Sequence, residues 1–142
     1  MTDYKNSPAW LKAMDLAEEI SRVTKTLAKT EGIREMRMAR NPFNHDAESI
    51  VLDIATAEGC KSIPSSYLRH MLAAQSATFR LESRLLLDVR RGYIEQSNVA
   101  AALKLCGELG ELLNTLTEKL AAEARTLRLN RQIRPIDSNF EL

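Results

Sequence analysis

The sequence contains few aromatic residues, few glycines and prolines, and almost no excess of charge of either sign. Aromatic side chains make up 5% of the 142 residues, beside abundant leucine and alanine, and this composition suits helices packed on helices. No stretch approaches the roughly 20 apolar residues that a membrane span needs. The N-terminus also lacks the apolar run of a signal peptide. The sequence therefore predicts a cytoplasmic protein with no membrane partner.

Cysteine and histidine are equally scarce, and this argues against metal and redox chemistry. Cys60 and Cys106 form no Cys-x-x-Cys motif, and no second ligand is spaced for zinc. A di-iron site in a helical bundle would need inward Glu-x-x-His pairs, but the residues three before His45 and His70 are Pro42 and Tyr67. We interpret both cysteines as reduced, and we predict no metal, no cofactor and no catalytic residue.

The formal net charge is +1, from 20 basic and 19 acidic side chains. Such a balance creates no strong global field toward nucleic acid or an anionic membrane. The charges are unevenly placed, because residues 1–60 carry an acidic excess and residues 61–142 a basic one. Any anion-binding surface is therefore expected in the second part of the chain.

Apolar residues spaced by three and four predict four amphipathic helices. We expect helices from Pro8 to about Gly32, from about 44 to 58, from 64 to 91, and from about 97 to 129. The pair Asn41–Pro42 should interrupt the helical structure before the second helix begins. The fold class predicted is an all-α, up-down-up-down four-helix bundle over residues 1–131, followed by an irregular tail over 132–142.

The third helix is predicted to contain more apolar residues than one inward face can use. The inward positions expected are Leu68, Met71, Leu72, Gln75, Phe79, Leu85, Leu86 and Val89. Leu81 and Leu87 then fall off this face, and spare apolar surface of that kind marks an interface. The fourth helix should pack beside the third, so that its residues 110–112 lie level with residues 76–78 of the third. Its Gly107 and Gly110 suggest a close approach of the two backbones.

Several short segments resemble a known family of small bacterial four-helix bundle proteins. The segments are residues 10–19 (WLKAMDLAEE), 57–59 (AEG), 73–86, 92–94 (GYI) and the stretch from Gly110 to Asn114. Their order and spacing are similar to those of proteins encoded in intervening sequences of 23S ribosomal RNA genes, over roughly residues 4–120. The resemblance implies a ring-like homopentamer. Related accessory proteins of diversity-generating retroelements use the same fold to bind a reverse transcriptase and nucleic acid.

Arginine clusters are the one plausible functional constellation in the sequence. Candidate nucleic-acid-binding residues are Arg80, Arg84 and Arg91 on one face of the third helix, and Arg125, Arg128 and Arg131 at the end of the fourth. Arginine forks suit phosphate, but arginines near a helix C-terminus also interact favourably with the helix dipole without any ligand. Two functions stay open: a non-enzymatic oligomer that binds RNA or serves a nucleic-acid enzyme, and a protein-interaction scaffold without nucleic-acid binding.

Overall fold

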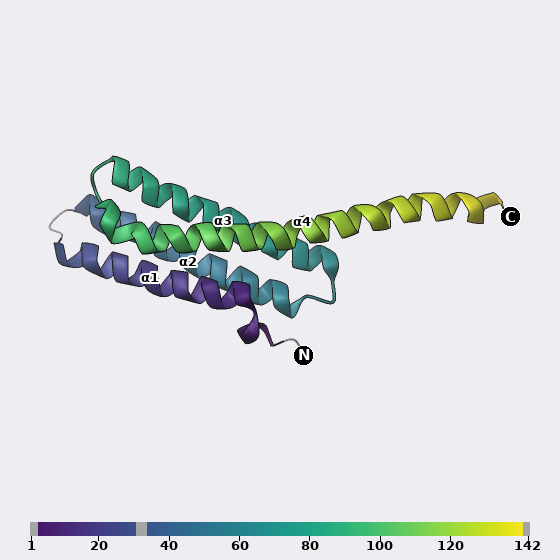
Figure 1. The fold of residues 1–142 in the computed structure, drawn as a ribbon, viewed down its shortest axis with the longest axis horizontal. Helices are drawn as coiled ribbons and strands as arrows, with labels where there is room; N and C mark the ends of the chain where they lie inside the picture. Colours follow the sequence, from purple (N-terminus) through teal and green to yellow (C-terminus); the bar gives the residue numbers. More distant parts are fainter. Residues whose placement is uncertain (1–2, 31–33, 141–142) are drawn as a thin grey trace.

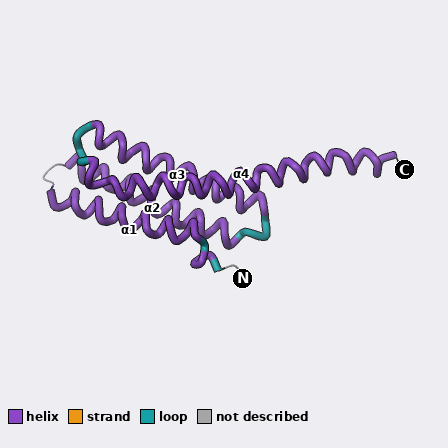
Figure 2. Tube along the Cα trace, in the orientation of Figure 1, coloured by secondary structure: helices purple, strands orange, loops and turns teal. Residues whose placement is uncertain are grey.

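The computed structural model describes the backbone of residues 3–30 and 34–140, and the side chains of residues 3–27 and 42–130. A short 3-10 helix, η1 (Tyr4–Asn6), precedes four long helices, namely α1 (Pro8–Thr30), α2 (Arg34–Gly59), α3 (Pro64–Arg90) and α4 (Gln96–Phe140). Each helix packs against its neighbour in the chain, and α1 packs against α4 to close the bundle (Figure 1). Helices and short connections make up the whole described chain, without strands (Figure 2). This is the predicted all-α four-helix bundle.

The helix ends follow the turn signals in the sequence. The Ser7 hydroxyl accepts a hydrogen bond from the Trp10 amide at 3.4 Å, as expected of a cap before α1. At the end of α3, Gly92 has a φ of 76°, which the missing side chain allows without strain. The Tyr93 and Gly92 amides bond back to the carbonyls of Asp88 and Val89. These two bonds form a Schellman motif, and they stop α3 where the sequence predicts.

The prediction that Asn41–Pro42 interrupts the helix is wrong. The α2 helix runs through Pro42 without interruption, from Arg34 to Gly59. Proline removes one helical hydrogen bond and crowds the preceding turn, at a cost of about 3 kcal/mol. Phe43 follows immediately and is fully buried in the core, as are Ala47 and Ile50. Burying a phenylalanine contributes roughly 1.5–3 kcal/mol, which offsets the loss at Pro42.

The end of the fourth helix also differs from the expectation. The α4 helix continues to Phe140, through a segment that we expected to be irregular. Residues 121–134 are rich in alanine, leucine and arginine, which have high helix propensity. The C-terminal part of α4 projects beyond the other three helices (Figure 1). We call residues 121–140 the α4 extension.

The register between α3 and α4 is confirmed, but the close approach at the two glycines is not. Gln75 on α3 donates a hydrogen bond to Asn114 on α4 at 3.2 Å, which agrees with the predicted level. A Cβ added to Gly110 would lie 3.6 Å from the ring of Phe79, an ordinary contact with a side chain. A Cβ on Gly107 would meet no atom of another element within 4 Å. The glycines therefore do not bring two backbones together.

The inward face of α3 is rotated from the one predicted. Met71, Ala74, Thr78, Leu81, Leu85 and Asp88 are among the buried residues, at steps of three and four. Leu81, predicted to lie off the core face, is completely buried. Leu72, Phe79 and Leu86, predicted to point inward, are each about half exposed. Met71, Gln75 and Leu85 are buried as predicted. Small and polar residues occupy much of the rest of the core face, so hydrophobicity alone placed the centre of that face incorrectly.

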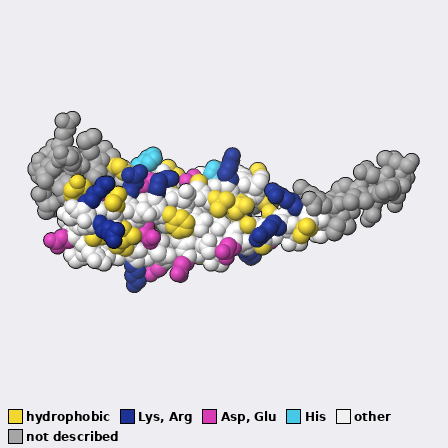
Figure 3. Space-filling model, turned by 90° about the horizontal axis from the view of Figure 1, so that it is seen from above, with side chains coloured by type: hydrophobic (Ala, Val, Ile, Leu, Met, Phe, Trp, Pro, Cys, Tyr) yellow, Lys and Arg dark blue, Asp and Glu magenta, His cyan; other side chains and the backbone are white. Residues whose placement is uncertain are grey.

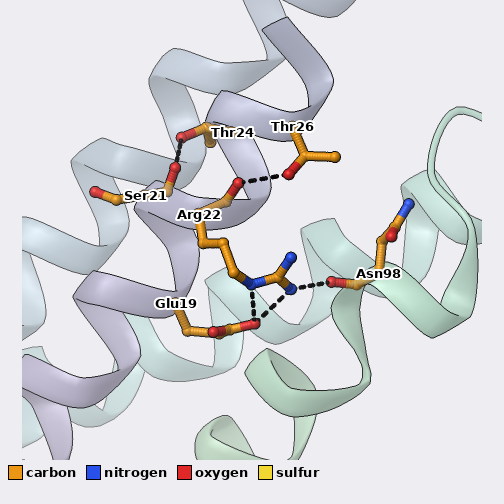
Figure 4. Close-up of polar contacts among 6 residues, drawn as sticks. All are labelled: Glu19, Ser21, Arg22, Thr24, Thr26 and Asn98. Atoms are coloured by element: carbon orange, nitrogen blue, oxygen red, sulfur yellow. Dashed lines mark hydrogen bonds and ion pairs between the residues drawn. The ribbon is translucent and has the colours of Figure 1, made fainter. Parts of the chain in front are cut away.

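Polar contacts join α1 to α4 across the closing edge of the bundle. Arg22 on α1 donates hydrogen bonds to the Glu19 carboxylate and, at 2.9 Å, to the backbone carbonyl of Asn98 in the first turn of α4 (Figure 4). Two to three turns away along each helix, Lys12 forms an ion pair with Glu108. These contacts hold the first half of α4 in place beside α1.

Candidate nucleic-acid interface and apolar seam

Two of the predicted arginines share one buried carboxylate. Asp46 lies on α2 with only 3% of its side chain exposed. Its two oxygens accept hydrogen bonds from Nε of Arg80 at 3.2 Å and from Nε of Arg84 at 3.1 Å. The guanidinium-bearing side chains remain 52% and 45% exposed. The sequence showed that these arginines share a face, but only the packing of α2 on α3 shows their common partner.

Arg91 continues the same side of α3 at its C-terminal end. Its Nη1 lies 3.8 Å from Oδ1 of Asp88, and its side chain is also about half exposed. Burial raises the pKa of Asp88, while the charges of Arg91 and Arg84 act in the opposite direction. Three arginines therefore line the C-terminal half of α3, each close to a carboxylate and each still accessible to solvent.

The arginines of α4 belong to a different region. Arg125 and Arg128 are exposed on the α4 extension, and the side chain of Arg131 lies outside the described residues. Arg128 borders a groove that also contains Pro64 and Arg69, at the N-terminal end of α3. Because the arginine row of α3 lies in the opposite half of that helix, the structure separates the two predicted clusters.

Exposed apolar side chains form a line along α3 that the sequence prediction had assigned to the core. We call Leu72, Phe79 and Leu86 the α3 seam; they follow one another at intervals of seven residues and are each about half exposed. Heptad spacing places them along one side of the helix. In Figure 3, apolar side chains gather in patches along the face shown, with basic side chains around them.

Two grooves between α3 and α4 adjoin the α3 seam. The larger, about 650 Å³, lies between the start of α3 and the α4 extension, and its apolar walls include Leu68, Leu72, Leu120, Ala124 and Leu127. The smaller, about 450 Å³, lies at the other end and includes Leu86, Leu87, Val89 and Leu103. Exposed apolar side chains that cluster in this way make the surface a candidate for contact with another molecule.

Glu58 has a structural role at the end of α2. It is buried at the end of α2, accepts a hydrogen bond from the Ser7 hydroxyl at 3.3 Å and lies 3.7 Å from the Lys61 ammonium group. Burial and the charge of Glu58 raise the pKa of Tyr67 on α3. These contacts connect the ends of three helices and leave Glu58 no free approach to a substrate.

The thiols and imidazoles form no catalytic constellation in the described chain. Cys106 is buried, and burial with the nearby charge of Glu82 raises the pKa of its thiol to about 12, so it stays protonated at neutral pH. Cys60 is partly exposed and unpaired. His70 lies 3.7 Å from Asp53, outside any group of three potential metal ligands in the part that the structure describes. None of the described helices is long and apolar enough to cross a membrane.

The fold defines the protein as an antiparallel four-helix bundle, with exposed arginines and apolar side chains on α3 and α4. The chain belongs to the family of 23S rRNA-intervening sequence proteins, whose model matches residues 5–115. A crystal structure of a protein of unknown function from the S23 ribosomal protein family of Bacteroides thetaiotaomicron has the same fold, with a TM-score of 0.68 and 19% identity. The similarity covers 77% of this chain and 97% of the other. No curated protein matches the sequence.

Proposed function

We propose that this protein is a non-enzymatic, self-associating bundle that binds RNA in the cytoplasm. The observation that carries the proposal is the row of half-exposed arginines on α3, at positions 80, 84 and 91. Arginine forks match the oxygens of phosphate groups. A long RNA presents such phosphate groups at regular intervals along its backbone. The unpaired cysteines suit a reducing compartment.

Self-association would use the α3 seam together with Leu87. Of the two leucines that the sequence selected as spare, Leu81 is part of the core, whereas Leu87 is 45% exposed beside Leu86. A second copy of the chain would remove these side chains from water. The resemblance to ring-forming proteins implies five subunits. A ring repeats the arginine row in every subunit, so weak contacts with a long RNA add by multivalency.

Light scattering and RNA retention together test this proposal. Light scattering should give a mass several times the 16.0 kDa of one chain, and Phe79→Asp should reduce that mass to one chain. RNA should be retained at about 50 mM salt, where screening is weak, and binding should fall steeply as salt rises. Replacing Arg125, Arg128 and Arg131 by serine should lower the affinity and the salt slope without changing the mass. A wild-type monomer that retains no RNA at low salt would overturn the proposal.

A protein-interaction scaffold is the second candidate function, and the larger groove favours it. Its walls are mainly apolar, and the α4 extension that forms one of them lies beyond the segment that matches the family model. Apolar grooves of this kind accept an amphipathic helix. Loss of partner binding on Leu127→Asp, with no retention of RNA by the unchanged protein, would select the scaffold over the RNA-binding function.

A further inference from the structure

The contact of Asp46 with two arginines leaves most of their hydrogen-bond donors unused. Each guanidinium has five N–H donors, and each gives only its Nε–H to Asp46. Neither makes another hydrogen bond among the residues that the structure describes. The four N–H bonds at the terminal nitrogens of each side chain therefore remain available, on side chains that are about half exposed.

The geometry also orients the two arginines before any ligand arrives. A carboxylate usually receives two parallel bonds from one arginine, but here Asp46 divides its oxygens between Arg80 and Arg84. These arginines are four residues apart on α3 and so lie side by side. Since Asp46 is buried and α2 holds it in place, it restricts the rotamers of both side chains. Restricting a side chain in advance lowers the entropy cost of binding.

The charge of the group favours a phosphate oxygen as its ligand. Two guanidinium groups and one carboxylate leave one net positive charge, and the terminal N–H groups make no hydrogen bond to Asp46. Arg91 lies seven residues further along α3, about 10 Å by the helical rise, so a polymer with regularly spaced phosphates can contact both places. The phosphodiester backbone of RNA has this chemistry.

We propose that Arg80 and Arg84, oriented by Asp46, form a clamp for the oxygens of a phosphoryl group, and that RNA presents this group. The inference rests on the proposed function and adds a positioning residue to it. Arg80 and Arg84 contact the phosphate; Asp46 acts only through them. The acidic residue is thus part of an anion-binding site, although its own charge repels the ligand.

Because Asp46 repels an anion but orients the arginines, replacing it by asparagine has opposite expected effects under the two explanations of binding. If charge alone governs binding, Asp46→Asn raises the affinity for RNA, because it removes a negative charge. If Asp46 orients the clamp, the same substitution lowers the affinity, because an asparagine offers one oxygen in place of two. Glu48→Gln is the matched control, since Glu48 is exposed on the same helix and its replacement changes the net charge equally.

Fluorescence anisotropy with a labelled single-stranded RNA of about 20 nucleotides, at low salt, measures the RNA affinity of the wild type, Asp46→Asn and Glu48→Gln. We expect Asp46→Asn to weaken binding about tenfold, the order of one hydrogen bond to a charged group. Glu48→Gln should leave the affinity unchanged or raise it. An affinity of Asp46→Asn equal to or above that of the wild type would overturn the role of Asp46.

A second variant keeps the test valid if Asp46→Asn fails to fold. The double substitution Arg80→Lys and Arg84→Lys preserves both charges but replaces the planar forks by single ammonium groups. The clamp predicts a loss of affinity of similar size, whereas binding by charge alone predicts none. Polyglutamate is the competitor for specificity. If polyglutamate displaces the RNA when its carboxylate concentration equals the concentration of RNA phosphates, the site binds acidic proteins equally well. This result would overturn the phosphate assignment.

Binding of pyrophosphate, measured separately from binding of RNA, distinguishes an error in the clamp from an error in the proposed function. In 15N NMR spectra, the Nε signals of Arg80 and Arg84 should shift on addition of pyrophosphate in the wild type, and much less in Asp46→Asn. A shift without retention of RNA would support the clamp and remove RNA as the partner. No shift with pyrophosphate and no effect of the substitutions on RNA binding would remove the clamp, even if RNA is retained elsewhere on the protein.

Discussion

The two halves of α4 have similar helix-forming sequences but very different surroundings. The first half places Val99, Cys106, Leu109 and Leu113 in the core, and Glu108 pairs with Lys12 of α1. The α4 extension buries none of its described residues, and Leu127 is 54% exposed. The family model ends at residue 115, within one turn of the last fully buried leucine. The bundle therefore coincides with the family match, and the extension adds surface to it.

This difference shows that helix propensity and helix burial are separate properties of one sequence. Apolar residues continue at spacings of three and four from Leu120 to Ala124 and Leu127, so the pattern alone extends the apolar stripe of the first half into the extension. The first half packs against both α1 and α3, whereas the extension projects past the other helices and faces only the start of α3, across the larger groove (Figure 1). An apolar residue in the extension has no core to enter.

The largest expected difference between the halves comes from the same substitution made in each. Leu113→Ala should lower the free energy of unfolding by about 2–5 kcal/mol, because it leaves a cavity in the core. Leu127→Ala should change it by no more than about 0.5 kcal/mol, as expected of an exposed position. Urea unfolding followed by circular dichroism measures both. Equal losses would show that the extension is packed in solution.

A smaller effect is expected at the glycines of the first half. Gly107→Ala should raise the free energy of unfolding by roughly 0.5–1 kcal/mol, since alanine favours the helix and its Cβ meets no other element. Gly110→Ala should also be tolerated, because the nearest neighbour is the Phe79 ring at an ordinary distance. Thermal unfolding of both variants checks these expectations. A destabilised Gly107→Ala would reveal a close contact at this surface, for example with another subunit.

The pH dependence of stability should depend on the first half as well. The hydrogen bond and charge of Lys12 lower the pKa of Glu108. A lowered pKa of a carboxyl group stabilises the folded protein above the pKa of the unfolded chain, and this contribution is lost as pH falls through the lower folded value. Glu108→Gln should therefore flatten the acid side of the stability profile slightly, since the pair is solvent-screened. Glu123→Gln on the extension is the control, and an equal flattening there would contradict the assignment.

The smallest effect on unfolding is expected from a helix break in the extension. Thr126→Pro should reduce the helical signal at 222 nm, because proline interrupts the helix. The midpoint of urea unfolding should stay the same, since no buried residue depends on this segment. A lower midpoint would show that the extension stabilises the folded state, and the contrast between the two halves of α4 would then fail.

Local signals predicted the bundle well because they depend on neighbours in the chain. Ser7, Pro64 and Gly92 mark helix ends through backbone geometry that each residue favours by itself. Once the turn after α3 is placed, the constant rise of a helix sets the level of Gln75 and Asn114. Two local signals failed: α2 continues through Pro42, where burial of Phe43 offsets the cost of the proline, and α4 continues past residue 129 to Phe140.

The candidate site was predictable only in part. The spacing of Arg80, Arg84 and Arg91 correctly placed three arginines along α3. Their partner Asp46 is 34 residues away from Arg80 and lies on another helix, so no local spacing in the sequence connects them. The α3 seam was assigned to the core, since Phe79 is large and apolar and nothing in the sequence shows that Ala77 and Thr78 take the inward positions.

The sequence by itself determined the number of helices, most of their ends and the pairing level of α3 with α4. These features follow from propensity, turn residues and the helical rise, which act over a few residues. Tertiary structure alone decided which face of α3 is buried, that Asp46 joins two arginines, and that the end of α4 stands apart from the bundle. Burial is a property of residues from several helices meeting at one place, and no single segment of the chain contains that information.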